Sequence, residues 1–206
     1  DVAQKTRFIS VELKYDSDVW AKWAEKANID GRCINFMLMH PELVTQRINP
    51  RAITTFFNAI SSIPKFESDL PLIQMIGEGS VGVDFSSMFT MFINNKLDRI
   101  ISPADILTKD ETYVLGSLTS AVGDGDDFRA DISSVIATRI INYSLALADK
   151  TSIGKPIIDR IAKLTTDCKA FTDDLRYYMV KEIVNGNKTK FSQLMMNQNV
   201  VKMAVK

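Results

Sequence analysis

The chain has 206 residues, of which 46% are hydrophobic and 24% charged, so it can bury one sizeable core or two small ones. Its 25 basic residues balance 25 acidic ones, and a zero net charge argues against a generally basic surface for nucleic acid. No apolar run approaches the ~20 residues that cross a bilayer, so no membrane partner is expected. Because the first residue is Asp1 rather than Met, we expect a fragment of a longer protein.

Residues 8–15 alternate apolar and polar side chains, which is the period-two pattern of a half-buried strand. The apolar positions are Ile9, Val11, Leu13 and Tyr15. A single strand leaves its backbone groups without partners and needs a neighbouring strand. The strand therefore either pairs with a sheet that lies outside this chain or is left without a partner.

The rest of the chain has helical periodicity, with no repeat and no low-complexity tract. In the first half, helices are expected to start at Asp16, Asn49, Ser68 and Ser102, and to cover residues 33–39 and 85–92. In the second half, they are expected over residues 108–121 and 128–147, from Ile157 to Phe171, and from Leu175 to Ile183, before a polar, Met-rich tail. The best boundary between the two halves is Thr108–Asp110.

The clearest helix start is Asn49-Pro50-Arg51. Asn is a preferred N-cap, and Pro suits the first helical position, where no amide partner is needed. The apolar stripe that follows comprises Ile53, Phe56, Phe57, Ile60 and Ile63. Arg51 lies off that stripe, so the core does not need it. An arginine fixed at this place suits the binding of an anion at a domain surface, and a solvated arginine is the alternative reading.

Several short motifs suggest chemistry that their surroundings do not support. Gly77 to Gly82 spells the dinucleotide-binding fingerprint, but no strand precedes it and no strand–helix units follow, so a flexible helix–helix turn is the better account. Gly154-Lys155 lacks the other residues of a phosphate loop. The acidic loop at Gly123–Asp127 lacks the order of a calcium loop. Tyr177-Tyr178 is best explained by core aromatic residues.

Cys33 and Cys168 match no metal spacing, and His40 is the only histidine, so no metal site is expected. Both cysteines lie among apolar residues at helical spacing. Buried, reduced thiols in an intracellular, cytoplasmic protein are the expectation. His40 precedes Pro41 at a helix end, where a structural imidazole that meets the last carbonyls is common. The residues alone therefore show no reaction centre.

Taken in order, the motifs of residues 6–107 resemble the back end of an AAA+ ATPase of the MoxR-like, phage-type group. The matching series is Thr6-Arg7-Phe8, the strand to Tyr15, Trp20-Ala21-Lys22-Trp23-Ala24, His40-Pro41-Glu42-Leu43, Asn49-Pro50-Arg51, Gly77-Glu78-Gly79 and Phe85-x-x-Met88-Phe89. The second half is similar only to less characterised helical extensions of such proteins, through Phe171-Thr172-Asp173-Asp174-Leu175-Arg176.

The resemblance implies a role for two arginines. In this family, the arginine of the Pro-Arg helix start belongs to a helical lid and senses the terminal phosphate of ATP, which maps onto Arg51. An arginine just before the last core strand acts in trans on the neighbouring subunit's nucleotide, and that position falls on Arg7. A guanidinium can grip phosphate oxygens in bidentate fashion, and it stays charged when partly desolvated.

The resemblance also implies what the chain lacks. The phosphate loop and the acidic strand that holds Mg²⁺ would lie before Asp1, so ATP and Mg²⁺ are expected only in the full-length protein. The implied fold is mainly α: a remnant strand at residues 1–15, a helical lid at 16–107 and a helical extension at 108–206. The implied partners are the missing AAA+ core, neighbouring subunits and a protein client.

Two other functions stay open at this level. One is a helical interaction module, a collar or client-docking unit, with no role for nucleotide. The other is a clamp-loader-like, DNA-associated subunit, which the neutral charge disfavours.

Overall fold

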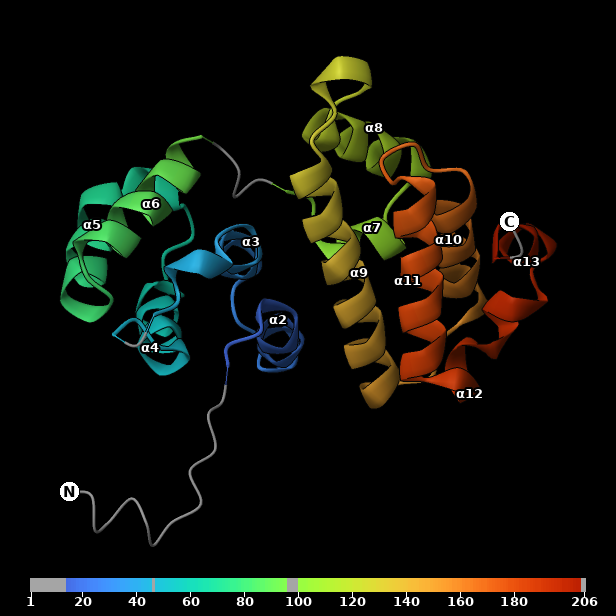
Figure 1. Ribbon diagram of the computed structural model, residues 1–206, viewed down its shortest axis with the longest axis horizontal. Helices are drawn as coiled ribbons and strands as arrows, with labels where there is room; N and C mark the ends of the chain where they lie inside the picture. Colours follow the sequence, from blue (N-terminus) through green and yellow to red (C-terminus); the bar gives the residue numbers. More distant parts are fainter. Residues whose placement is uncertain (1–13, 46, 96–99, 205–206) are drawn as a thin grey trace, which may run out of the picture.

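The computed structural model describes residues 14–45, 47–95 and 100–204, and within them the chain is all-α (Figure 1). It is 77% helical, and none of the described residues forms a strand, which confirms the prediction of a mainly α fold. The predicted strand at residues 8–15 lies almost entirely outside the described residues. Its last two positions, Lys14 and Tyr15, form irregular backbone that leads into the first described helix.

A first helical unit gathers around phenylalanine side chains. Its helices are α2 (Ser17–Lys26), α3 (Gly31–Met39), α4 (Pro50–Ile60), α5 (Leu70–Ser80) and α6 (Val83–Asn94), with 3-10 turns η1 (Pro41–Leu43) and η2 (Phe66–Ser68). Phe36 and Phe56 both meet Phe89 edge to face, with ring centroids 5.0 and 5.5 Å apart. Such pairs add about 0.5–1.5 kcal/mol each beyond their buried area. All three rings are fully buried, so α3, α4 and α6 meet at this point.

A second unit packs around one long helix with an aliphatic core. Its helices are α7 (Pro103–Thr108), α8 (Glu111–Val122), α9 (Ala130–Lys150), α10 (Lys155–Thr166), α11 (Asp173–Gly186), α12 (Lys188–Phe191) and α13 (Gln198–Ala204), with turns η4 (Gly125–Asp127) and η5 (Ser192–Met196). The core side chains on α9 include Ile132, Ile136 and Ile140. The polar, Met-rich tail is thus folded into short helices, anchored by the buried Phe191, Leu194 and Val200.

Helix α9 connects the two units. It contacts α11 on one side, and α2 and α3 pack against it from the first unit (Figure 1). The two hydrophobic cores stay separate, because the contact between α9 and the first unit includes polar side chains, among them Arg139 and Glu25.

The division between the cores lies earlier than residues 108–110. Ile106 and Leu107 of α7 belong to the second core, and the partly buried Ile100 and Ile101 pack against it. The last residue of the first core is Ile93. Helical periodicity identifies the apolar face of α7 but cannot tell which of two cores will receive it.

Gly77 and Gly79 lie inside α5, so the expected helix–helix turn does not begin at Gly77. A Cβ on Gly77 would come within 2.6 Å of Ser86 Oγ on α6, so the glycine allows α5 and α6 to pack closely. The turn itself is shorter, at Val81-Gly82, where Gly82 takes a φ of +93°. A helical Gly77 has no free amides to cradle a pyrophosphate, which agrees with rejecting the dinucleotide motif.

Helix α10 ends at Thr166, before the predicted end at Phe171. Cys168 and Phe171 are buried as expected, but from the connection to α11 rather than from a helix. At this end of the helix, the guanidinium of Arg176 donates hydrogen bonds to the carbonyl groups of Thr166 and Cys168.

Candidate functional site

The start of α4 is capped as the sequence predicts. Asn49 is extended, and its Oδ1 accepts a hydrogen bond from the amide of Ala52 at 3.0 Å. Pro50 occupies the first helical position and has no N–H to satisfy. Of the first three helical residues, only Arg51 therefore keeps an unpaired amide. The positive end of the helix dipole and one free donor coincide at Arg51.

The side chain of Arg51 is exposed, and no described residue forms an ion pair or hydrogen bond with it. The hydroxyl groups of the two threonines that follow turn back on the helix: Thr54 donates to Pro50 O at 2.8 Å and Thr55 to Arg51 O at 3.0 Å. They add no negative charge. The guanidinium is therefore available to an anion from outside this part of the chain.

Arg51 lines a shallow hollow of about 400 Å³ between α2 and α4. The other lining residues are Trp20, Trp23, Pro50, Thr54 and Thr55. Trp20 is buried against Phe57, with ring centroids 6.2 Å apart, whereas Trp23 is 48% exposed. An exposed indole beside an uncompensated arginine offers a flat apolar surface and a cation within one hollow.

A second hollow of about 640 Å³ shares Trp20, Trp23 and Pro50 with the first and extends toward Tyr15. The Tyr15 hydroxyl is buried without a hydrogen-bond partner. Burial, followed by the charges of Asp16 and Asp18, raises the pKa of Tyr15 to about 12. The hydroxyl therefore keeps its proton at neutral pH, but its burial keeps it from a ligand in the hollow.

The two hollows can bind but contain no catalytic group of the usual kinds. Asp16 lines the larger one, and its carboxylate caps α2 by accepting from the amides of Asp18 and Val19. Among the described residues, no three His, Cys, Asp or Glu side chains gather where they could hold a metal ion. A cation and an exposed indole face suit a ligand with an anionic group and a planar ring.

The other residues singled out in the sequence lie elsewhere. Arg7 is outside the described residues, so its role on a neighbouring subunit's nucleotide stays a prediction. The His40 ring packs against Phe36 at a tilt of 48°, with ring centroids 5.0 Å apart, and its Nδ1 lies 3.2 Å from Glu42 Oε1 rather than at the helix carbonyls. Cys33 and Cys168 are buried in different cores, and burial raises the pKa of both thiols.

Tyr15 and Trp23 were not predicted as part of a site with Arg51. The sequence gives little indication of this site. Trp23 follows the buried Trp20 by three positions, and this spacing indicates that both tryptophans lie on one apolar helix face. The structure places the two rings 6.3 Å apart and leaves Trp23 at the edge of that face, next to α4.

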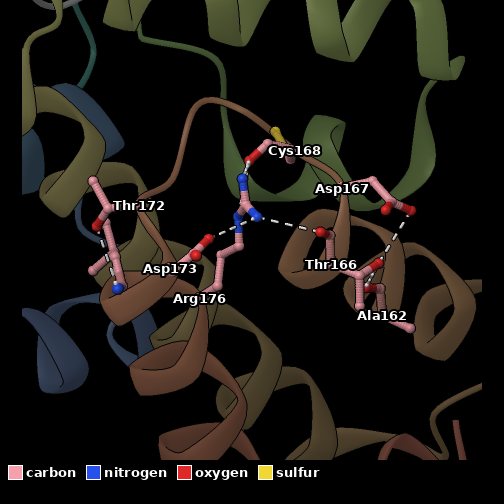
Figure 2. A network of polar contacts seen from close by, with 8 residues as sticks. Ala162, Thr166, Asp167, Cys168, Thr172, Asp173 and Arg176 are labelled. Carbon is pink, nitrogen blue, oxygen red and sulfur yellow. Dashed lines mark hydrogen bonds and ion pairs between the residues drawn. The ribbon is translucent and has the colours of Figure 1, made fainter. Parts of the chain in front are cut away.

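A second polar cluster is centred on Arg176 and is structural (Figure 2). Its Nε and Nη2 donate to Cys168 O at 3.1 and 2.8 Å, and its Nη1 donates to Thr166 O at 3.2 Å. Asp173 lies 3.2 Å from the same Nη1 and is largely exposed. Thr172 caps α11 by accepting from the amide of Leu175. The guanidinium thus ends α10 and leaves little capacity for a ligand.

No protein-family model, curated protein or solved structure matches this chain. None of the described helices combines the length and apolar character that crossing a membrane requires.

Proposed function

We propose that this chain is the helical, C-terminal part of an AAA+ ATPase. We further propose that Arg51 contacts the terminal phosphate of ATP bound to the core of the same polypeptide. The proposal rests on the motif series of residues 6–107. It is supported by the exposed, uncompensated guanidinium of Arg51 in the hollow between α2 and α4. That observation carries the proposal, because a solvated arginine would need neither a fixed helix start nor an adjoining aromatic hollow.

The chemistry follows from the arrangement at α4. The cap by Asn49 and the ring of Pro50 fix the backbone from which Arg51 projects. An arginine held at one place loses less conformational entropy when it binds phosphate, and its charge cannot be lost by deprotonation. Contact with the terminal phosphate would draw the first unit toward the core, and loss of that phosphate would release it. ATP binding and hydrolysis would thereby remodel a protein client.

The described residues fit the phosphate and the base of a nucleotide, but not its metal ion. Arg51 matches the first, and the exposed face of Trp23 matches the second. No acidic cluster among the described residues could hold Mg²⁺. Magnesium and the phosphate cradle would come from the core of the longer protein, and so we expect no ATP hydrolysis by this chain alone.

The test is ATP turnover by the intact protein. Arg51→Ala should lower kcat by about tenfold or more, because a guanidinium on the transferred phosphoryl group is lost. Arg51→Lys should restore only part of the activity, because lysine cannot make the bidentate contact. Arg47→Ala is the matched control: Arg47 is also exposed, lies four residues away and lines neither hollow. Unchanged turnover and unchanged ATP-driven closure in Arg51→Ala would contradict the sensor role.

The natural reading frame gives an independent check. A Gly-x-x-x-x-Gly-Lys-Ser/Thr element should lie upstream of Asp1, about two hundred residues back, with an acidic metal-binding strand after it. Its absence from the natural polypeptide would refute the assignment to this class of ATPase.

An interaction module without any nucleotide role is the second candidate. Exposed apolar side chains in the second unit favour it, notably Tyr113 on α8 and Met196 in η5. The Arg51 variants separate the two candidates, because a module of this kind would work equally well without the guanidinium. A DNA-associated subunit would instead show salt-sensitive DNA binding, which the neutral charge disfavours.

A further inference from the structure

The C-terminal segment presents methionines and lysines on its outer side. Residues 187–206 contain four lysines and no acidic residue, a net charge of +4. Phe191, Leu194 and Val200 are fully buried and hold the segment against the bundle. Met195 and Met196 are 45% and 79% exposed. We call the exposed part the tail surface, and it comprises Lys188, Met195, Met196, Val201 and Lys202.

A groove of about 720 Å³ runs along α8. Small residues form much of its lining, so the surface is open at their positions: Thr112, Gly116, Ser117, Ser120 and Ala121. A Cβ on Gly116 would meet no other atom within 4 Å. Tyr113 flanks the groove with more than half of its surface exposed. Arg129 also lines the groove, but its Nη2 forms an ion pair with Asp131 Oδ2 at 2.7 Å.

An acidic loop follows α8, beyond the groove-lining residues Ser120 and Ala121. Arg129 N donates to Val122 O at 2.7 Å and closes a loop that carries Asp124, Asp126 and Asp127. All three aspartates are exposed, and none forms an ion pair with another described residue. These three aspartates give the loop a negative charge, whereas Lys188 and Lys202 give the tail surface a positive one.

We propose that the tail surface of one copy of this chain docks into the α8 groove of a second copy. Unbranched methionine side chains adapt to an irregular groove lined by small residues. Lys188 and Lys202 would lie near the acidic loop of the neighbour, where opposite charges steer association. The occupant is a second copy because both complementary surfaces belong to the same chain.

The geometry makes the contact head to tail. The acidic loop with η4 stands at one end of the bundle, whereas α13 lies at its side (Figure 1). A contact between two different surfaces closes in a two-fold dimer only if both tails reach the partner's groove at once; otherwise each dimer leaves one groove and one tail unused. Association then either stops at a reciprocal dimer or continues into rings or open chains. This inference does not depend on Arg51 or on nucleotide.

Sedimentation velocity of the 206-residue chain tests the contact. The sedimentation coefficient should rise with concentration up to about 200 µM in about 50 mM salt, and the rise should shrink in about 500 mM salt. A single monomeric species throughout this range would overturn the proposal. If that monomer also cosediments with vesicles of anionic phospholipid, and K188E/K202E abolishes this binding, the tail surface faces a membrane and not a second copy.

Charge reversal on the two sides gives the sharper test. K188E/K202E makes both surfaces acidic, and D126K/D127K makes both basic, so each variant alone should associate at least about tenfold more weakly. An equimolar mixture should associate again, because each variant then meets a partner of opposite charge. Failure of the mixture to recover, with both variants folded by circular dichroism, would overturn the proposal.

Matched controls separate this contact from general effects of charge and exposed apolar surface. R47E/K65E reverses two exposed charges in the first unit and should leave association unchanged. M195S/M196S should weaken association, whereas M75S/M91S removes two equally exposed methionines from α5 and α6 and should not. Equal loss in both methionine pairs would show nonspecific apolar association and refute the α8 groove as the binding site.

Discussion

Arg139 on α9 and Glu25 on α2 form a buried ion pair, with Nε and Oε1 2.8 Å apart across 114 residues of sequence. Both side chains are less than 10% exposed. The guanidinium also donates from Nη1 to Asn35 Oδ1 on α3 at 3.1 Å. One side chain of the second unit thus binds two helices of the first, and it does so where the two hydrophobic cores do not merge.

Removing one partner of this pair should destabilise the chain strongly. Glu25→Ala leaves a buried guanidinium without its carboxylate, which costs about 3–5 kcal/mol in comparable pairs. The double variant Glu25→Leu with Arg139→Met removes both charges and should lie much closer to the parent. Urea unfolding gives both free energies, and a loss below about 1 kcal/mol for Glu25→Ala would show that water reaches the pair.

Gly31 should not tolerate a side chain. A Cβ at this position would lie 2.7 Å from Arg139 Nη2, so Gly31→Ala must displace the guanidinium from its partners. We expect a loss of about 1–3 kcal/mol. Gly79→Ala is the matched control, since Gly79 is helical and has no neighbour within 4 Å of the added methyl. It should stabilise by about 0.5–1 kcal/mol through helix propensity. Equal effects in the two variants would contradict the close approach at Gly31.

Asp30 should make stability depend on pH in the acid range. Burial alone would raise its pKa, but hydrogen bonds from the side chain and amide of Arg32 outweigh that effect and lower the pKa. A lowered pKa in the folded state means that the unfolded chain binds this proton first. The stabilisation is therefore complete above about pH 4 and is lost as the pH falls further toward the folded-state pKa.

Asp30→Asn isolates this contribution, because asparagine can still cap α3. At pH 6 the variant should be less stable than the parent by about 1 kcal/mol. The difference should shrink as the pH falls through the lowered folded-state pKa, where the parent's carboxyl becomes neutral. Urea unfolding at several pH values measures this, and a difference that does not change with pH would exclude the Asp30–Arg32 pair as its source.

Arg176 should protect Cys168. The guanidinium holds the carbonyls of Cys168 and Thr166, so Arg176→Ala loses several hydrogen bonds at the end of α10 and should cost about 1.5–3 kcal/mol (Figure 2). The loosened connection should expose the thiol to a disulfide reagent. Cys33, fully buried in the other core, serves as the internal control and should stay unreactive. Equal reactivity in the parent and the variant would show that Arg176 does not hold this segment.

Local patterns predicted the helices well, because caps and apolar periodicity act over a few residues. Asp16, Asn49 and Ser102 cap helices as expected, each through a side-chain oxygen that accepts from an amide two or three positions later. The features that the sequence did not reveal depend on distant contacts. Gly77 leaves room for Ser86 of α6, and Arg176 of α11 donates to the Thr166 carbonyl at the end of α10.

The candidate site shows the same limit. Arg51 could be found from its helix start alone, since the cap and the apolar stripe fix its position on α4. The hollow beside it could not, because it requires α2 and α4 to lie side by side with Trp23 turned toward solvent. No local pattern determines how two amphipathic helices cross when their apolar faces are both rich in aromatic residues.

The placement of the tryptophans gives the chain a built-in optical reporter. Both of its tryptophans lie on α2, whereas four of its five tyrosines lie on α8, α9 and α11. Emission excited at the red edge of the absorption band therefore follows the first unit alone, while tyrosine absorbance follows mainly the second. The two units can thus be monitored separately in an unlabelled chain, and any order in their unfolding becomes visible.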